Sequence, residues 1–144
     1  MPRVEFYEAS VSDLEAVLCR LVERAYRSGE RVYVWTAAET QARRIDELLW
    51  TFTEESFVPH GLWQGEAVDP VEVDPIAIGW LRGNPNGADC LCLARNAAPK
   101  EVAGFSRIMD LVPSDDRTLK EAARSRYRSF REAGFEVFYH PKKG

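Results

Sequence analysis

Basic side chains and one tyrosine recur at helical spacing near the end of the chain, and they are the residues best suited to bind a ligand. At about 100° per residue, one face of the predicted helix collects four of them, with Arg128 on its flank: Lys120, Arg124, Tyr127 and Arg131. Arginine and lysine make charge-assisted hydrogen bonds to anions, and a tyrosine ring adds apolar surface beside them. This face predicts a site for an anion that carries a hydrophobic group. A solvated basic face, whose arginine stems only cover apolar surface, is the alternative.

A second candidate surface is aromatic. Trp50 lies about 100° beyond Leu49 on another predicted helix, away from the apolar stripe of that helix, and Phe57 follows in the loop. Tryptophan and tyrosine are enriched at protein interfaces as buried anchors. The pair indicates a surface that binds a partner, or else a local cover in which the loop around Phe57 packs over Trp50.

The sequence gives little support to catalysis. His60 could act as a general base with Glu54 or Glu55, which would make the chain a small cytoplasmic hydrolase. A lone histidine without a nucleophile beside it is more often a structural residue. The hydrolase is therefore kept only as the alternative function.

The three cysteines predict buried thiols and no metal site. Cys90 and Cys92 lie two apart on a predicted strand and point to one face, but no further Cys or His stands at the spacing of metal ligands. Cys19 borders the apolar stripe of a predicted helix. All three are expected to be small, reduced core residues.

Nucleotide-binding loops are absent from the sequence. It contains neither G-x-x-x-x-G-K-[ST] nor G-x-G-x-x-G. Gly83 and Gly87 bracket a turn between two predicted strands, where no helix N-terminus would stand behind a phosphate. The sequence predicts no nucleotide and no other cofactor.

Strands and helices alternate in the first half of the chain. Residues 4–7 predict a strand, and Ser12 with Glu15 forms a capping box that should open a helix ending at Gly29. The apolar stripe of this helix is Leu14, Val17, Leu18, Leu21, Val22 and Ala25. Residues 31–36 predict a central strand, whose Thr36 should cap the next helix. That helix has the stripe Ala38, Ala42, Ile45, Leu49 and Phe52.

The second half continues the alternation after residues 53–75, whose prolines and glycines predict an irregular loop. Strands are predicted over 76–80, 89–94, 105–112 and 135–139, with a helix over 119–133 that Gly134 ends. Leu119, Ala123 and Phe130 should form the core face of that helix. Alternating strands and helices imply right-handed crossovers and a parallel sheet. Residues 1–144 thus predict one three-layer α/β domain with a mostly parallel sheet flanked by helices, Rossmann-like but without a nucleotide-binding loop.

Length, composition and charge narrow the functional classes. A chain of 144 residues, 45% of them hydrophobic, fits one globular domain. No apolar run approaches the ~18 residues of a membrane span, and the N-terminus lacks the apolar core of a signal peptide, so a cytoplasmic protein is expected.

The charge is distributed unevenly along the chain. Residues 1–116 carry 11 basic and 20 acidic side chains, a net charge of −9, whereas residues 117–144 carry 8 basic and 3 acidic side chains, a net charge of +5. The acidic body opposes direct nucleic-acid binding, and the basic end suits a local anionic partner.

Four blocks of sequence resemble one known family. They are residues 27–32, 46–50 and 55–60, and a last block that runs from Leu111-Val112-Pro113 through 119–128 to Ala133-Gly134-Phe135. Their order and spacing resemble the chi subunit of bacterial DNA polymerase III, which belongs to the clamp-loader assembly. The resemblance implies an α/β fold without a nucleotide site and a subunit with no catalytic role of its own.

The resemblance also implies two protein partners. Chi subunits hold the acidic C-terminal tail of single-stranded DNA-binding protein, and the matching positions here are Val112, Lys120, Arg124, Tyr127 and Arg128. They also pair with a psi subunit that joins the clamp loader, and the matching positions are Trp50 and Phe57. Direct contact with nucleic acid or with a membrane is not implied. Both implied sites coincide with the two surfaces that the residue pattern singles out.

Overall fold

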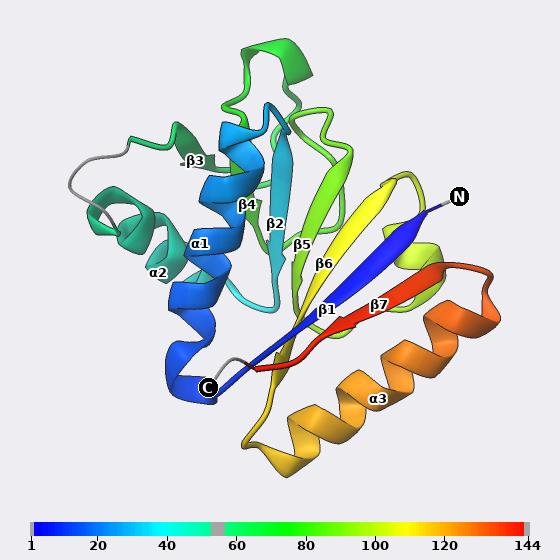
Figure 1. Ribbon diagram of the computed structural model, residues 1–144. Coiled ribbons are helices and arrows are strands. Elements are labelled where there is room, and N and C mark those ends of the chain that lie inside the picture. The colour runs from blue at the N-terminus through cyan, green and yellow to red at the C-terminus, as the bar shows by residue number, and fades with distance from the viewer. Residues whose placement is uncertain (1, 53–56, 143–144) are drawn as a thin grey trace.

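The computed structural model describes residues 2–52 and 57–142, and its described part is built on one parallel sheet (Figure 1). The strand order across the sheet is β3-β4-β2-β5-β6-β1-β7, and every pairing between neighbours is parallel. The strands are β1 Arg3–Ala9, β2 Val32–Thr36, β3 His60–Leu62, β4 Ile76–Gly79, β5 Cys90–Ala94, β6 Arg107–Pro113 and β7 Glu136–His140. The α/β class and the parallel sheet predicted from the sequence are confirmed.

Helices cover both faces of this sheet. The α-helices are α1 Leu14–Arg27, α2 Glu39–Thr51 and α3 Arg117–Glu132, and 3-10 turns span Val11–Asp13, Pro70–Glu72 and Pro99–Val102. Helices α1 and α2 pack on one face, in front of the sheet in Figure 1, whereas α3 packs on the other. The predicted three-layer arrangement is confirmed.

Alternation along the strands supplies both cores. In β2, Val32 and Val34 face α1 and α2, whereas Tyr33 and Trp35 face the opposite layer. Successive side chains of a strand point to opposite faces, so a strand buried on both sides must be apolar throughout. β2 is buried along its whole length, as expected for the predicted interior strand.

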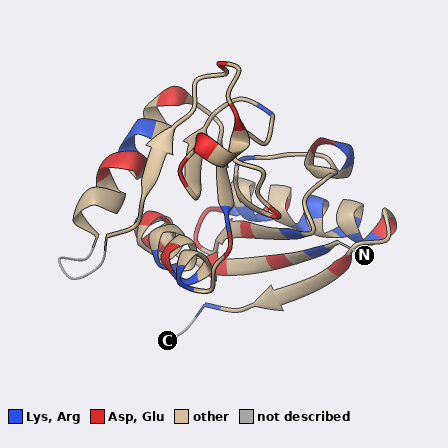
Figure 2. Ribbon diagram, turned by 90° about the horizontal axis from the view of Figure 1, so that it is seen from above, with Lys and Arg blue, Asp and Glu red and all other residues tan. Residues whose placement is uncertain are grey.

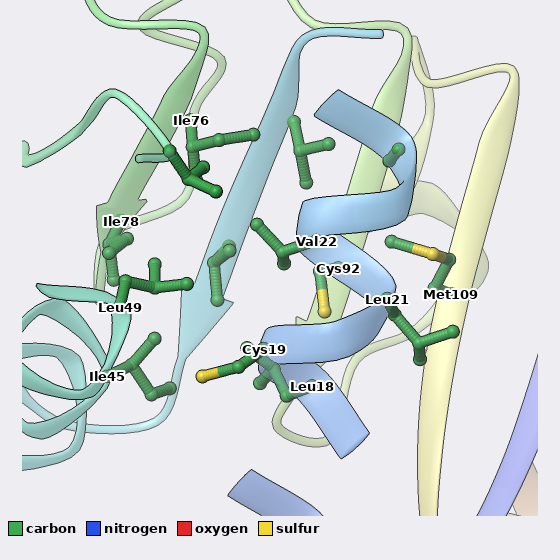
Figure 3. Packing of buried hydrophobic residues seen from close by; sticks show 14 of the residues in the cluster. Leu18, Cys19, Leu21, Val22, Ile45, Leu49, Ile76, Ile78, Cys92 and Met109 are labelled. Carbon is green, nitrogen blue, oxygen red and sulfur yellow. The ribbon is translucent and has the colours of Figure 1, made fainter. Parts of the chain in front are cut away.

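The core under α1 and α2 contains all three cysteines, of which Figure 3 labels Cys19 and Cys92. Cys19, Cys90 and Cys92 are buried and unbridged, as predicted. Burial raises the pKa of Cys19 to about 11 and that of Cys90 to about 12. A thiol held in its neutral form is a poor nucleophile. The cysteines are therefore packing residues.

Two predicted helix caps are wrong. Helix α1 begins at Leu14, after a 3-10 turn in which the Asp13 amide donates to the Ser10 carbonyl oxygen at 2.9 Å. The Glu15 carboxylate, predicted to close a capping box with Ser12, instead pairs with Arg44 of α2 at 2.7 Å. Thr36 is not the cap of α2 either, because its buried hydroxyl donates to the Ala38 carbonyl oxygen at 2.9 Å. The Glu15 side chain thus binds another helix, and the Thr36 hydroxyl donates to a carbonyl oxygen at the start of α2 instead of accepting from an amide there.

A short strand lies inside the predicted irregular loop. Residues His60–Leu62 form β3, the sheet edge, by pairing with β4 in the register His60↔Ile76 and Leu62↔Ile78. Three residues that include a glycine carry no apolar alternation, so only the neighbouring strand reveals this element. The prediction of loop throughout 53–75 is therefore wrong at these residues.

Candidate functional site

A cavity of about 370 Å³ lies between α3 and the neighbouring strands. The five positions that sequence analysis assigns to the tail site all line it: Val112, Lys120, Arg124, Tyr127 and Arg128. The other residues around it are Phe6, Glu8, Ala123 and Tyr139. The fold thus brings β1, β6, β7 and α3 together at one hollow that combines positive charge with apolar surface.

Two adjacent parallel strands supply the floor of the cavity. β1 and β6 pair so that Glu8 lies beside Val112, and both strands direct alternate side chains toward α3. The Phe6 ring lies 5.5 Å from the Tyr127 ring, measured between centroids. This aromatic contact fixes the middle of α3 against β1 and leaves the Tyr127 ring as an apolar wall.

Basic side chains form the opposite wall, and Figure 2 shows that basic residues recur along α3. Lys120, Arg124 and Arg128 succeed one another at intervals of four residues, and they therefore span about 12 Å of one helix face. Arg131 was predicted on the same face, but within the described residues the cavity lining ends at Arg128. The Arg131 side chain is exposed one turn from this wall.

Helix α3 is anchored by a buried ion pair that the sequence analysis missed. The Arg126 guanidinium donates to both carboxylate oxygens of Asp110 at 2.8 Å, and a further N–H donates to Asn96 at 3.0 Å. Burial raises the pKa of Asp110 to about 6, which leaves the carboxylate ionised at neutral pH opposite the guanidinium. This pair fixes the rotation of α3 about its axis and thereby aims the basic wall at the cavity.

The core face of α3 also differs from the prediction at one position. Ala123 and Phe130 are buried as expected, but Leu119 is 46% exposed. Arg126 takes the third core position, because residues 123, 126 and 130 are spaced by three and four. The helical spacing of residues 123, 126 and 130 could have placed Arg126 on the core face. The single aspartate in the apolar strand β6, Asp110, could have been recognised as the ion-pair partner of Arg126.

Glu8 and Tyr139 form an acidic corner in the otherwise basic cavity. The Tyr139 hydroxyl donates to the Glu8 carboxylate, and this hydrogen bond is the main cause that holds the pKa of Glu8 below its ordinary value. Burial, the same hydrogen bond and the negative charge of Glu8 raise the pKa of Tyr139 to about 12. At neutral pH the corner therefore consists of a carboxylate and a neutral phenol.

The second predicted surface lies on the other side of the sheet. The Trp50 side chain, near the end of α2, is 56% exposed, and that of Phe57 is 64% exposed. Their ring centroids are 5.5 Å apart, and the Trp50 ring lies 4.6 Å from the His60 ring. The Phe57 ring packs against the Trp50 ring at an interplanar angle of 43°, but both side chains stay exposed, so they form one exposed apolar patch.

His60 serves as the base of this patch. Its ring is buried, with Nδ1 2.7 Å from the Val58 carbonyl oxygen and Nε2 2.9 Å from the Asp46 carbonyl oxygen. Both ring nitrogens are thus occupied by the backbone, which leaves neither available to activate a nucleophile. Glu54 and Glu55, its predicted partners in the alternative hydrolase, lie outside the described residues.

The part of the chain that the structure describes contains neither a metal site nor a membrane-spanning helix. Over residues 2–52 and 57–142, no group of three or more His, Cys, Asp or Glu side chains could hold a metal ion. The same residues contain no helix with the length and apolar character needed to cross a bilayer.

The fold defines a class of protein: an α/β domain without a nucleotide-binding loop, with a basic and partly apolar cavity on one side of its sheet and an exposed aromatic patch on the other. Comparison with known proteins gives the family. A family model described as DNA polymerase III chi subunit, HolC, matches residues 1–138. DNA polymerase III subunit chi of Pseudomonas aeruginosa is 37% identical over 143 residues, which cover 97% of this chain and 96% of that protein. The same subunit of Escherichia coli is 37% identical, with coverage of 88% and 84%, and that of Haemophilus influenzae is 38% identical, with coverage of 86% and 84%.

This chain belongs to the DNA polymerase III chi subunit family. Membership makes it an accessory subunit of the replicative polymerase and not the catalytic one.

Proposed function

We propose that this protein links the DNA polymerase III assembly to the acidic C-terminal tail of single-stranded DNA-binding protein, and that it joins the clamp loader by pairing with a psi subunit. The main support for tail binding is that five residues line one cavity: Val112, Lys120, Arg124, Tyr127 and Arg128. We place this function in the cytoplasm and assign it no cofactor.

The chemistry of the cavity suits such a tail. An acidic peptide that ends in an apolar residue offers carboxylates together with one hydrophobic side chain. Arg124 and Arg128 can each donate two parallel hydrogen bonds to a carboxylate, while Val112 and Tyr127 wall an apolar space beside them. One exposed charge pair contributes only about 0.2–1 kcal/mol, so binding depends on several pairs acting together with apolar burial.

The exposed patch of Trp50 and Phe57 supports the second half of the proposal. Large aromatic side chains that are more than half exposed and touch each other are typical anchors of a protein interface. The patch lies on the α2 side of the sheet, whereas the cavity lies on the α3 side. A psi subunit on the patch would therefore leave the cavity open for the tail.

Direct binding of nucleic acid is the competing function. The basic residues of α3 could attract phosphate, but residues 1–116 carry a net charge of −9, from 11 basic and 20 acidic side chains, which opposes a polyanion. Glu8 inside the cavity adds a negative charge at the surface that the phosphate would have to approach.

A titration separates these functions. A synthetic peptide of aspartates that ends in phenylalanine should bind with weak to moderate affinity, and its affinity should fall as salt is added. The same peptide without its terminal phenylalanine should bind less tightly, and an unstructured single-stranded oligonucleotide should not bind. Tight binding of the oligonucleotide without binding of the peptide would reverse the assignment.

A further inference from the structure

The cavity proposed for an acidic tail already contains a carboxylate of its own. Glu8 lies on the cavity side of β1 with 15% of its side chain exposed, and its Oε2 is 4.0 Å from Lys120 Nζ. A negative charge in this position opposes the ligand that the rest of the cavity attracts. The Glu8 charge therefore limits which ligand side chains can bind in the part of the cavity next to it.

Glu8 is held in place by one residue of the edge strand β7 and by one residue just after that strand. One oxygen accepts a hydrogen bond from the Tyr139 hydroxyl, and the other accepts from the Lys142 amide at 3.3 Å. These donors keep the carboxylate ionised at neutral pH, because they lower the pKa of Glu8. Glu8 is therefore a fixed charge of the cavity and not a side chain that a ligand can simply push away.

The fixed charge divides the cavity into two ends. Glu8 lies beside Val112 in the register of β1 and β6, and Lys120 is the basic residue that it compensates. Arg124 and Arg128 lie about 6 and about 12 Å further along α3. One end thus holds the Glu8 carboxylate, with Lys120 and Lys142 near it, next to an apolar side chain, and the other end holds guanidinium groups.

We propose that Glu8 determines the specificity of this cavity. Its carboxylate compensates Lys120 and excludes a ligand carboxylate from the Val112 end. An acidic peptide must then bind with its carboxylates at Arg124 and Arg128 and with an uncharged, apolar side chain next to Val112. This inference rests on the proposed tail-binding function, and it explains why an apolar residue would be selected over one more acidic residue.

The test compares two peptides on three proteins at low salt. One peptide consists of aspartates and ends in phenylalanine, and in the other this phenylalanine is replaced by aspartate. The proteins are the wild type, Glu8→Gln and Glu47→Gln. Glutamine keeps an oxygen that can accept from Tyr139, and Glu47 is exposed on α2, so its substitution changes the net charge equally but far from the cavity.

The wild type and Glu47→Gln should prefer the phenylalanine peptide by the same ratio. Glu8→Gln should bind the all-aspartate peptide roughly twofold to fivefold tighter and so lose much of the preference, because the substitution removes one charge that repels the added aspartate. Lys120→Ala should weaken binding more in the Glu8→Gln background than in the wild type, because only there is Lys120 uncompensated. Unchanged melting temperatures exclude a folding defect.

Two results separate the possible failures. One result is that the wild type binds the phenylalanine peptide, but Glu8→Gln either keeps the wild-type ratio of affinities for the two peptides or binds both more weakly. The proposed role of Glu8 would then be wrong, while the proposed tail site would be unaffected. If the wild type binds neither peptide, the tail-binding function falls, and the specificity role falls with it.

Discussion

Arg126 of α3 and Asp110 of β6 form a bidentate ion pair in the interior, with two N–O distances of 2.8 Å and 0% of the aspartate side chain exposed. Neither residue lines the cavity that carries Lys120, Arg124 and Arg128. The pair lies on the opposite side of the same helix turns, so it sets the direction in which these basic side chains point. The proposed binding at the cavity should therefore depend on a contact that lies outside the cavity lining.

Loss of one partner of this pair should destabilise the protein strongly. Asp110→Asn leaves the buried Arg126 guanidinium uncompensated, which should lower the free energy of unfolding by about 3–5 kcal/mol. Urea denaturation measures the change, with Glu132→Gln on the exposed side of α3 as the control. The double variant Asp110→Leu with Arg126→Leu should recover a large part of the loss, because it removes both charges together. A double variant as unstable as Asp110→Asn would contradict this account.

Substitution of Arg124 should weaken the tail contact without weakening the fold. A hydrogen bond to a charged group contributes about 1.5–3 kcal/mol, so Arg124→Ala should raise the dissociation constant of the aspartate peptide roughly tenfold to a hundredfold. The melting temperature should hardly change, because this side chain is exposed. Added salt should weaken the wild type more than the variant, which has already lost a charge contact.

Arg131→Ala is the matched control for this experiment. Arg131 carries the same charge on the same helix but lies beyond the cavity wall. Equal losses for Arg124→Ala and Arg131→Ala would mean that the peptide senses only the net charge of α3 and not the cavity.

Phe57 should contribute to the psi contact alone. Truncation of an interface aromatic often costs about 2 kcal/mol or more, so Phe57→Ala should weaken psi binding by at least about thirtyfold and leave the aspartate peptide unaffected. Val71→Ala, which changes an 85% exposed side chain elsewhere, serves as the control. Isothermal titration with each partner separately reports both affinities. A joint loss of both affinities with an intact circular dichroism spectrum would refute the assignment of two separate surfaces.

The stability of the fold should fall in mild acid through Glu5. Burial raises the pKa of this carboxyl, but the hydrogen bond from Arg107 at 2.7 Å and the charges around it outweigh burial, so the net pKa is lowered. A lowered pKa stabilises the folded state above the unfolded pKa, near 4.5, and this contribution is lost as the pH falls through the folded pKa. Urea denaturation from pH 6 to pH 3 should therefore show Glu5→Gln less stable than the wild type at pH 6, with a difference that shrinks toward pH 3. A difference that does not change with pH would contradict the role of the charge.

Much of this architecture follows from spacing that is visible in the sequence. The apolar stripe of α1 and the position of Gly29, which takes a φ of +84° after the helix, are local features, and both were predicted correctly. The basic face of α3 and the off-stripe position of Trp50 are local in the same sense. Both sites could be indicated because each depends largely on one helix.

Features that depend on a distant neighbour escaped prediction. β1 was expected to end at Tyr7 but continues to Ala9, because β6 pairs with it up to Pro113. Glu8 therefore belongs to a strand only by virtue of residues more than 100 positions away, and its direction into the cavity was not visible. Arg126 escaped for a related reason, since a charged residue on an apolar face is expected outside the core until its partner is known.

The strand order separates the two contact surfaces by a fixed width. Trp50 lies on α2, which packs over β3 and β4, whereas the cavity rests on β6, β1 and β7. Four inter-strand intervals separate β4 from β1, or roughly 19 Å at the usual spacing of strands. If the two proposed partners are held in one assembly, the sheet would act as a rigid spacer between them, and attachment of one would raise the effective concentration of the other. A contact that is weak in isolation would then persist within that assembly, and it could still release and rebind quickly.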